Sequence, residues 1–244
     1  MKILLSPSEG KNKNLKFIEQ ENNFLESLTP KFAERKDVVI SYLEALNGED
    51  KEICKIFGTK SVGMDDLALS KNMFYLESMQ AIQLYDGVAF KALDFASLNQ
   101  KSKDFIFNHV CIFSNLLGMI EAKDKIPYYK LNQNYKNKNF GLNTIYKKMT
   151  KVLDEYFSDK KIIDLRAEVY IKAYPIKKEH IVVEFLKNGK KVSHYAKHYR
   201  GVFLRDLALH QGDITALKTL HEMELKDIVQ EKNKNIYIYD VINN

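Results

Sequence analysis

Residues 181–196 read IVVEFLKNGKKVSHYA. Two stretches rich in β-branched and aromatic residues flank Asn188-Gly189, the dipeptide that best suits a two-residue type I′ hairpin turn, because both of its positions need positive φ. These residues therefore predict an antiparallel β-hairpin. A sheet that contains such a hairpin beside strands joined by helices has mixed character.

Short apolar runs elsewhere predict further strands. They lie at residues 2–6 (KILLS), 110–120 (VCIFSNLLGMI), 161–165 (KIIDL) and 235–241 (NIYIYDV). Apolar residues at helical spacing predict helices over residues 71–84, 144–157 and 199–210, and Thr29-Pro30 predicts the start of another. Strands and helices interleave from end to end, so we expect an α+β fold in which a single domain, residues 1–244, contains a mixed β-sheet wrapped by helices.

The composition is that of a globular protein. Of the 244 residues, 45% are hydrophobic, and there are only four prolines and ten glycines, which allows a sizeable core. No run approaches the roughly 20 apolar residues that cross a bilayer, and the N-terminus reaches charged residues too soon for a signal peptide. We therefore expect a cytoplasmic protein without membrane contact. Cys54 and Cys111 form no CxxC pair, which argues against a disulfide framework or a thiolate zinc site.

The net charge of +6 is modest, but the charge is unevenly distributed. Residues 125–153 contain no acidic side chain, and lysines there alternate with Tyr128, Tyr129, Tyr135 and Tyr146. Cations neutralise phosphates and aromatic rings stack on unpaired bases, so this composition is typical of a surface for single-stranded or distorted nucleic acid. A solvated loop in a sequence rich in Lys and Asn explains it equally well.

A second basic group follows the predicted hairpin. Lys197, Arg200 and Arg205 span the predicted junction between strand and helix. Free backbone N–H groups at a helix N-terminus attract anions, and arginine can bind a phosphate with two parallel hydrogen bonds. Ion pairing with acidic residues such as Glu168 or Glu184 is the alternative use of these cations.

Several segments share the pattern of a known family. The predicted strand at residues 2–6 leads into Ser6-Pro7, and Lys11 follows after Ser8-Glu9-Gly10. Four more segments with the family pattern lie further along the chain. These are LYDGVAF at 84–90, PYYKL at 127–131, IDLRAEVY at 163–170 and YAKHYRGVFLR at 195–205. In these segments the chain resembles the YaaA peroxide-stress resistance family, as a divergent member. The family's Trp-Gly-Asp element is missing, and its Ser-Gly-x-Tyr-Gly-x-Leu-Arg-Pro run is replaced at residues 114–122.

The resemblance implies a YaaA-like fold and a role in the oxidative stress response to hydrogen peroxide, with limitation of free iron and of oxidative DNA damage. It also implies a basic cleft that binds DNA and a helix-hairpin-helix-like element, for which residues 58–63 (GTKSVG) are the candidate and an ordinary interhelical turn the alternative. The partner would be DNA, distorted or partly single-stranded. The nucleic-acid-binding residues would be Lys11, Tyr128, Lys130, Lys197, Arg200, Gly201 and Arg205.

Two alternatives to a DNA-binding protein stay open, although we favour a protein without enzymatic activity. Asp86, Asp164 and Glu168 would serve an enzyme acting on nucleic acid or a nucleotide, with Asp86 or Glu168 as the catalytic carboxylate. His194 and His198, four residues apart, would share a metal only if one helix carried both. No common nucleotide-binding or hydrolase motif is present, and we expect no cofactor, no metal and no protein partner.

Overall fold

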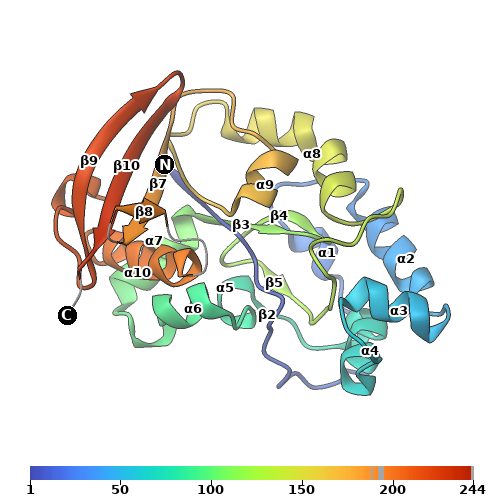
Figure 1. Ribbon diagram of the computed structural model, residues 1–244. Coiled ribbons are helices and arrows are strands. Elements are labelled where there is room, and N and C mark those ends of the chain that lie inside the picture. Colours follow the sequence, from blue (N-terminus) through green and yellow to red (C-terminus); the bar gives the residue numbers. More distant parts are fainter. Residues whose placement is uncertain (188, 192–194, 243–244) are drawn as a thin grey trace.

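The computed structural model describes residues 1–187, 189–191 and 195–242. In this part of the chain, eight strands form one sheet in the order β4-β3-β1-β6-β7-β10-β9, and β8 pairs with β7 (Figure 1). Their bounds are β1 (Lys2–Leu5), β3 (Val110–Ser114), β4 (Gly118–Glu121), β6 (Ile162–Leu165), β7 (His180–Lys187), β8 (Lys190–Lys191), β9 (Met223–Glu231) and β10 (Lys234–Val241). The pairs β1–β3, β1–β6, β6–β7 and β7–β10 are parallel, and β3–β4, β7–β8 and β9–β10 are antiparallel. The predicted mixed sheet is confirmed.

The central strands are buried on both faces. Every residue of β1, β3, β4 and β6 is buried, as the continuous apolar runs require. Figure 1 shows α8 (Leu142–Phe157) and α9 (Glu168–Ala173) on one side of the sheet, and α6 (Val88–Leu93), α7 (Gln100–His109) and α10 (Ala196–Leu209) on the other. One hydrophobic cluster extends from Ile3 to Tyr239, so the helices on both faces of the sheet share a core. The domain bounds 1–244 stay a prediction.

The remaining elements are short. They are α1 (Phe24–Ser27), α2 (Arg35–Ala45), α3 (Asp50–Phe57), α4 (Met64–Lys71), α5 (Ala81–Leu84) and a two-stranded sheet of β2 (Met79–Gln80) and β5 (Lys125–Ile126). Figure 1 shows α2, α3 and α4 at the end of the molecule opposite β9 and β10. None of the described helices is long and apolar enough to cross a membrane.

The predicted hairpin is confirmed where the structure describes it. Leu186 pairs with Lys191 and Lys187 with Lys190, and Gly189 has a φ of 74°. Asn188 and residues 192–194, which the prediction included, lie outside the described residues. The predicted strands at 2–6, 161–165 and 235–241 are confirmed, and residues 110–120 prove to span two strands, β3 and most of β4.

One predicted helix is wrong, and another starts later than predicted. Over residues 71–84 the chain forms a 3₁₀ turn, β2 and α5 instead of one helix. Leu76 and Met79 pair with the distant residues Phe17 and Ile126, which favours an extended backbone at both positions. The helix expected to start at Thr29-Pro30 forms, but it begins at Arg35 and contains Val38, Val39 and Tyr42 of the predicted apolar stripe.

Candidate functional site

A cavity of about 390 Å³ opens at the carboxyl ends of β1 and β6. Residues 5–10, which complete β1 and continue it as a loop, form one wall, and Ala167, which follows β6, forms another. In the parallel core, β1 pairs with β3 on one side and with β6 on the other. The strand order therefore changes direction at β1. Ligands of open α/β sheets bind outside the carboxyl ends of strands at such a point.

Two cations of α10 line this cavity. Lys197 is exposed and Arg200 is half-buried, and their i, i+3 spacing places both on one face of the helix. Among the described residues, neither has a carboxylate within 4.0 Å. Burial lowers the pKa of the Arg200 guanidinium, and the charge of Asp164 opposes this effect. Asp164 itself is held by Arg166, whose Nη2 lies 2.6 Å from its Oδ2, so Arg200 stays available to a ligand.

Gly201 lets α10 approach α6 closely. A Cβ at this position would lie 2.1 Å from the carbonyl oxygen of Ala89 and 2.8 Å from the Cβ of Ala92. Ala89 also lines the cavity, so the close contact fixes the distance between two of its walls. The residue predicted to contact nucleic acid is buried in a helix interface, and the structure gives it a packing role.

Arg205 lies away from the cavity. Its Nη1 donates to the carbonyl oxygens of Leu93 and Asp94, at 2.8 and 3.0 Å, where α6 ends. The Asp94 carboxylate is 3.8 Å from the same nitrogen. Arg205 therefore caps the C-terminus of α6, which corrects its predicted place beside Lys197 and Arg200.

Tyr128 and Lys130 belong to a cluster around Asp66 in α4. The Tyr128 hydroxyl donates to Oδ1 of Asp66 at 2.7 Å, Lys130 Nζ donates to Oδ2 at 2.6 Å, and Lys13 pairs with the same carboxylate. Tyr128 is only 2% exposed, and Tyr129 and Tyr146 are fully buried. The predicted stacking of Tyr128 on a base is wrong, because the ring presents no face to solvent.

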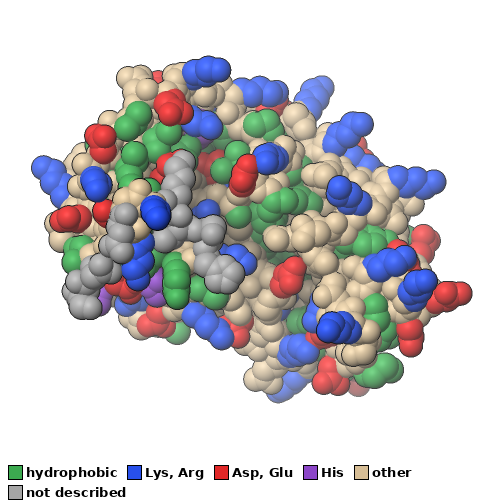
Figure 2. Space-filling model, in the orientation of Figure 1, with side chains coloured by type: hydrophobic (Ala, Val, Ile, Leu, Met, Phe, Trp, Pro, Cys, Tyr) green, Lys and Arg blue, Asp and Glu red, His purple; other side chains and the backbone are tan. Residues whose placement is uncertain are grey.

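The lysines of the acid-free segment are spread out. Lys136, Lys138, Lys147, Lys148 and Lys151 are exposed and have no ion pair to any described residue. Figure 2 shows Lys and Arg side chains dispersed over the visible face, with acidic side chains among them. On that face they do not form one continuous basic groove.

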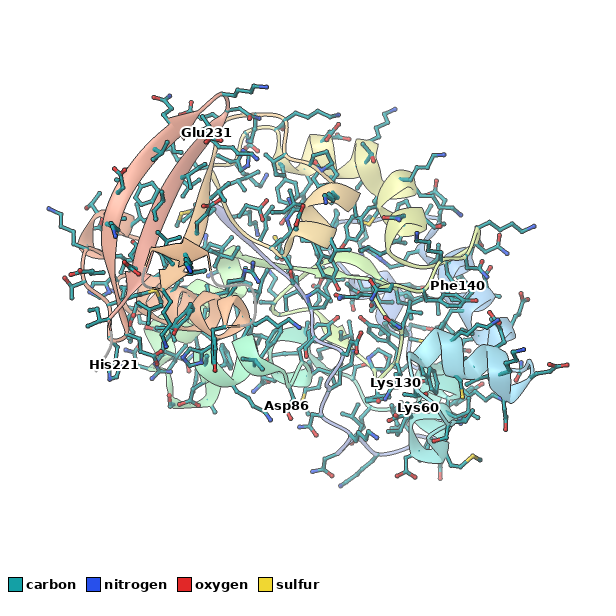
Figure 3. The ribbon with its side chains drawn as sticks, in the orientation of Figure 1. Lys60, Asp86, Lys130, Phe140, His221 and Glu231 are labelled. Atoms are coloured by element: carbon teal, nitrogen blue, oxygen red, sulfur yellow. The ribbon has the colours of Figure 1, made fainter. Side chains whose placement is uncertain are left out.

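The two predicted catalytic carboxylates differ in placement. Asp86 lines the cavity and lies 3.6 Å from Lys91 Nζ. Figure 3 shows it well separated from Lys130. Glu168 is exposed beyond Ala167 and pairs with Lys172 at 2.6 Å, and this hydrogen bond lowers the pKa of its carboxyl group. Only Asp86 of the pair faces the cavity.

The structure describes only one of the two histidines suggested to share a metal. His198 Nε2 lies 2.7 Å from Oε2 of Glu222, and His194 lies outside the described residues. Within residues 1–187, 189–191 and 195–242, no three His, Cys, Asp or Glu side chains are placed to share a metal ion.

The segment proposed as a helix-hairpin-helix has a helix on either side. α3 ends at Phe57, Gly58 adopts a left-handed φ of 69°, and α4 begins at Met64. The Thr59 amide donates to Cys54 at 3.0 Å, which is how an interhelical turn satisfies the end of a helix. The structure does not confirm a phosphate-binding hairpin here.

Lys11 is buried rather than presented to solvent. Its side-chain nitrogen donates to the carbonyl oxygens of Ser8 at 3.1 Å and Glu9 at 3.5 Å, and it lies 4.1 Å from the ring centre of Tyr129. Desolvation lowers its pKa from 10.5 to about 7, although the charge of Glu9 opposes the shift. The family resemblance had implied that this residue contacts nucleic acid.

Sequence reasoning missed several polar residues on the cavity wall. Ser6, Ser8 and Glu9 come from the loop after β1, and Asn115 and Gln133 come from segments after β3 and β5. The signal for the loop was available, because SPSEG directly follows a buried strand. Asn115 and Gln133 carried no such signal.

A mixed sheet with a small polar cavity at the carboxyl ends of its strands is typical of α/β proteins whose ligands bind at that edge. Two cations, Lys197 and Arg200, and two carboxylates, Glu9 and Asp86, line the cavity. The family model described as peroxide stress protein YaaA matches residues 1–232, and the chain belongs to this family. Two bacterial relatives are similar to the chain over nearly its whole length. The chain is 36% identical to the uncharacterized protein Cj0984 of Campylobacter jejuni over 242 residues, which cover 95% of this chain and 97% of the relative. It is 31% identical to a UPF0246 protein of Corynebacterium glutamicum over 249 residues, with 96% of each chain covered.

Proposed function

We propose that this peroxide stress protein binds distorted or partly single-stranded DNA, with a phosphate held by Lys197 and Arg200 and an unpaired nucleotide in the cavity. The observation that carries the proposal is the pair of cations on the cavity wall, neither of which is neutralised by a described carboxylate. By covering exposed nucleotides, such a protein would limit oxidative DNA damage and keep free iron away from them.

The size of the cavity favours a nucleotide over a duplex. Small-ligand sites typically measure about 300–1,000 Å³, and 390 Å³ lies at the lower end of that range. An intact duplex cannot enter such a space, whereas an unpaired nucleotide can leave the stack at a cost of a few kcal/mol. The exposed lysines at 136–151 would add non-specific attraction to the flanking phosphates.

A salt titration tests the proposal directly. Affinities for duplex, single-stranded and bubbled DNA of one sequence are measured against salt concentration, with wild-type protein and a Lys197→Ala/Arg200→Ala variant. Each lost phosphate contact should reduce the slope of log K against log salt by about 1, so we expect a reduction of about 2. The matched control is Lys226→Ala, an exposed cation on β9 that pairs with Asp240, which should leave the slope unchanged. A wild-type slope near zero, or equal slopes for wild type and double variant, would defeat the proposal.

A second candidate function is an enzyme that acts on nucleic acid or a nucleotide in the same cavity. The observation in its favour is Asp86, a half-exposed carboxylate on the wall, which could serve as a general base. Glu168 gives this candidate no support, because Lys172 holds it outside the cavity. Two results together would exclude this candidate function: the wild-type protein turns over no nucleotide or oligonucleotide, and an Asp86→Asn variant binds DNA as the wild type does.

A further inference from the structure

The cavity has an unusual amine behind its wall. Lys11 is 8% exposed, and no described carboxylate lies within 4.0 Å of its Nζ. Its partners are two backbone carbonyl oxygens and the faces of Tyr129 and Tyr85, whose ring centres lie 4.1 and 5.2 Å away. Buried lysines normally have a carboxylate partner, and a lysine without one is easily deprotonated.

This amine is close to the cavity. Ser8, Glu9 and Gly10 line the cavity, and Lys11 follows them directly. Its Nζ donates a hydrogen bond of 3.1 Å to the carbonyl oxygen of Ser8. On the other side, Lys11 forms a β-bridge with Tyr85, and Gly10 accepts a hydrogen bond from the Asp86 amide. The lysine is therefore anchored at both ends, directly behind the loop that lines the cavity. Lys11 itself lines a second cavity, which shares Asp86 and Phe90 with the first.

The surroundings of Lys11 favour the neutral amine. Desolvation by buried aromatic and backbone groups disfavours the ammonium ion and brings the pKa to about 7. The charge of Lys130 acts in the same direction. A desolvated neutral lysine is the form that attacks carbonyl carbon.

We propose that Lys11 forms a reversible imine with an aldehyde carried next to a phosphate, such as the ring-opened sugar of an abasic site in DNA. This inference rests on the proposed function and deepens it, since it names the chemical class of the ligand. Loss of a damaged base leaves an aldehyde-bearing sugar between two phosphates. The cavity in front of the loop that precedes Lys11 has Lys197 and Arg200 on its wall, and these cations could hold such phosphates.

The reaction is balanced without a co-reactant. The Nζ lone pair attacks the aldehyde carbon, and the carbonyl π electrons move to oxygen. A proton passes from nitrogen to that oxygen, the hydroxyl group leaves as water after a second protonation, and a C=N bond forms. The nitrogen then returns one proton to solvent if the neutral imine is released, and addition of water reverses every step.

Reductive trapping tests the inference. Wild-type protein is incubated with cyanoborohydride and either an oligonucleotide that contains an abasic site or glyceraldehyde 3-phosphate, and the modified peptide is identified by mass spectrometry. We expect the adduct on Lys11, with a yield that rises between about pH 6 and about pH 8 as the amine is deprotonated. The two arms distinguish DNA from a small phosphorylated aldehyde as the source of the ligand.

Lys11→Arg and Lys13→Arg form the matched variants. Both keep a cation, and Lys13 is the nearest lysine in the same segment, half-exposed and paired with Asp66. The Lys11 adduct should disappear in the first variant and persist in the second. Because a substitution at buried Lys11 can unfold the protein, peptide mapping on the wild type decides by itself. Absence of any adduct, or adducts confined to exposed lysines, would overturn the inference.

Failure of this inference is distinguishable from failure of the proposed function. The same abasic oligonucleotide is titrated without reductant, at several salt concentrations. Salt-dependent binding that needs Lys197 and Arg200, without an adduct on Lys11, overturns the imine alone. Absence of salt-dependent binding overturns the proposed function, whatever glyceraldehyde 3-phosphate does.

Discussion

Replacing Gly201 with alanine tests how closely α6 and α10 must pack to form the cavity. The added Cβ would lie 2.1 Å from the carbonyl oxygen of Ala89, and contacts below 3.0 Å do not occur in real structures. The obstructing atom belongs to the backbone, so it cannot rotate away as a side chain could. The two helices must therefore separate by on the order of 1 Å.

The expected energy follows from two opposing effects. Overpacking costs typically 1–3 kcal/mol, and the backbone clash at this site favours the upper end of the range. Alanine in place of glycine in a helix returns about 1 kcal/mol. We expect a net loss of about 2 kcal/mol, which for a chain of this size lowers the Tm by about 4–8 °C.

Thermal and urea unfolding followed by circular dichroism would measure the loss. The control is Gly48→Ala at an exposed bend, where the nearest atom to a new Cβ is 3.2 Å away, and we expect a change within about 0.5 kcal/mol. Because Ala89 and Arg200 both line the cavity, Gly201→Ala should also weaken DNA binding with all charges retained. A Gly201→Ala variant as stable as wild type would refute the packing argument.

Three further predictions concern buried groups. Arg166→Met should lower the free energy of unfolding in urea by about 3–5 kcal/mol, because it leaves the Asp164 carboxylate buried and unpaired. Arg166→Met combined with Asp164→Leu should lower it by less. An equal or larger decrease in the double variant would contradict this prediction. The pKa of Lys11 is about 7 in the folded chain and 10.5 when the side chain is free, so between these pH values the folded chain binds fewer protons than the unfolded chain. The stability of the wild type should therefore rise with pH in this range by up to about 1.4 kcal/mol per pH unit relative to Lys11→Met. Parallel curves of stability against pH for the two proteins would contradict this prediction. Burial raises the pKa of the Cys111 thiol to about 12, so hydrogen peroxide followed by mass spectrometry of the native protein should find Cys111 unmodified and any oxidation at Cys54; oxidation of Cys111 in folded protein would contradict it.

The parts of the fold that the sequence predicts correctly depend on local chemistry. The β-branched run before Asn188-Gly189 and the apolar runs of β1, β6 and β10 need no information from distant residues. The helix expected over residues 71–84 failed because its apolar residues have long-range partners: Phe17 for Leu76 and Ile126 for Met79. Nothing in a local window distinguishes an apolar residue that packs on a helix face from one that joins a distant strand.

For the candidate site, too, the sequence predicts only what depends on neighbouring residues. Lys197 and Arg200 stand together on one helix, so their spacing alone brings them to one wall. Tyr128 and Lys130 were misjudged because their partner, Asp66, is more than sixty residues away in the sequence. Alternating Lys and Tyr have the same composition whether the rings stack on bases or fill a core, and only tertiary packing separates the two.

Lys11 and Lys197 show why residue type alone does not give a role. Both were predicted to bind nucleic acid, yet Lys197 is exposed to water, whereas Lys11 is surrounded by aromatic rings and carbonyl groups. Hydration stabilises an ammonium ion, and removal of water disfavours it. One lysine is thus suited to holding an anion and the other to acting as a neutral nucleophile. Lys197 and Lys11 line two adjacent cavities that share Asp86 and Phe90. Together they could hold a phosphate and bond reversibly to a carbonyl group beside it, which neither residue could do alone.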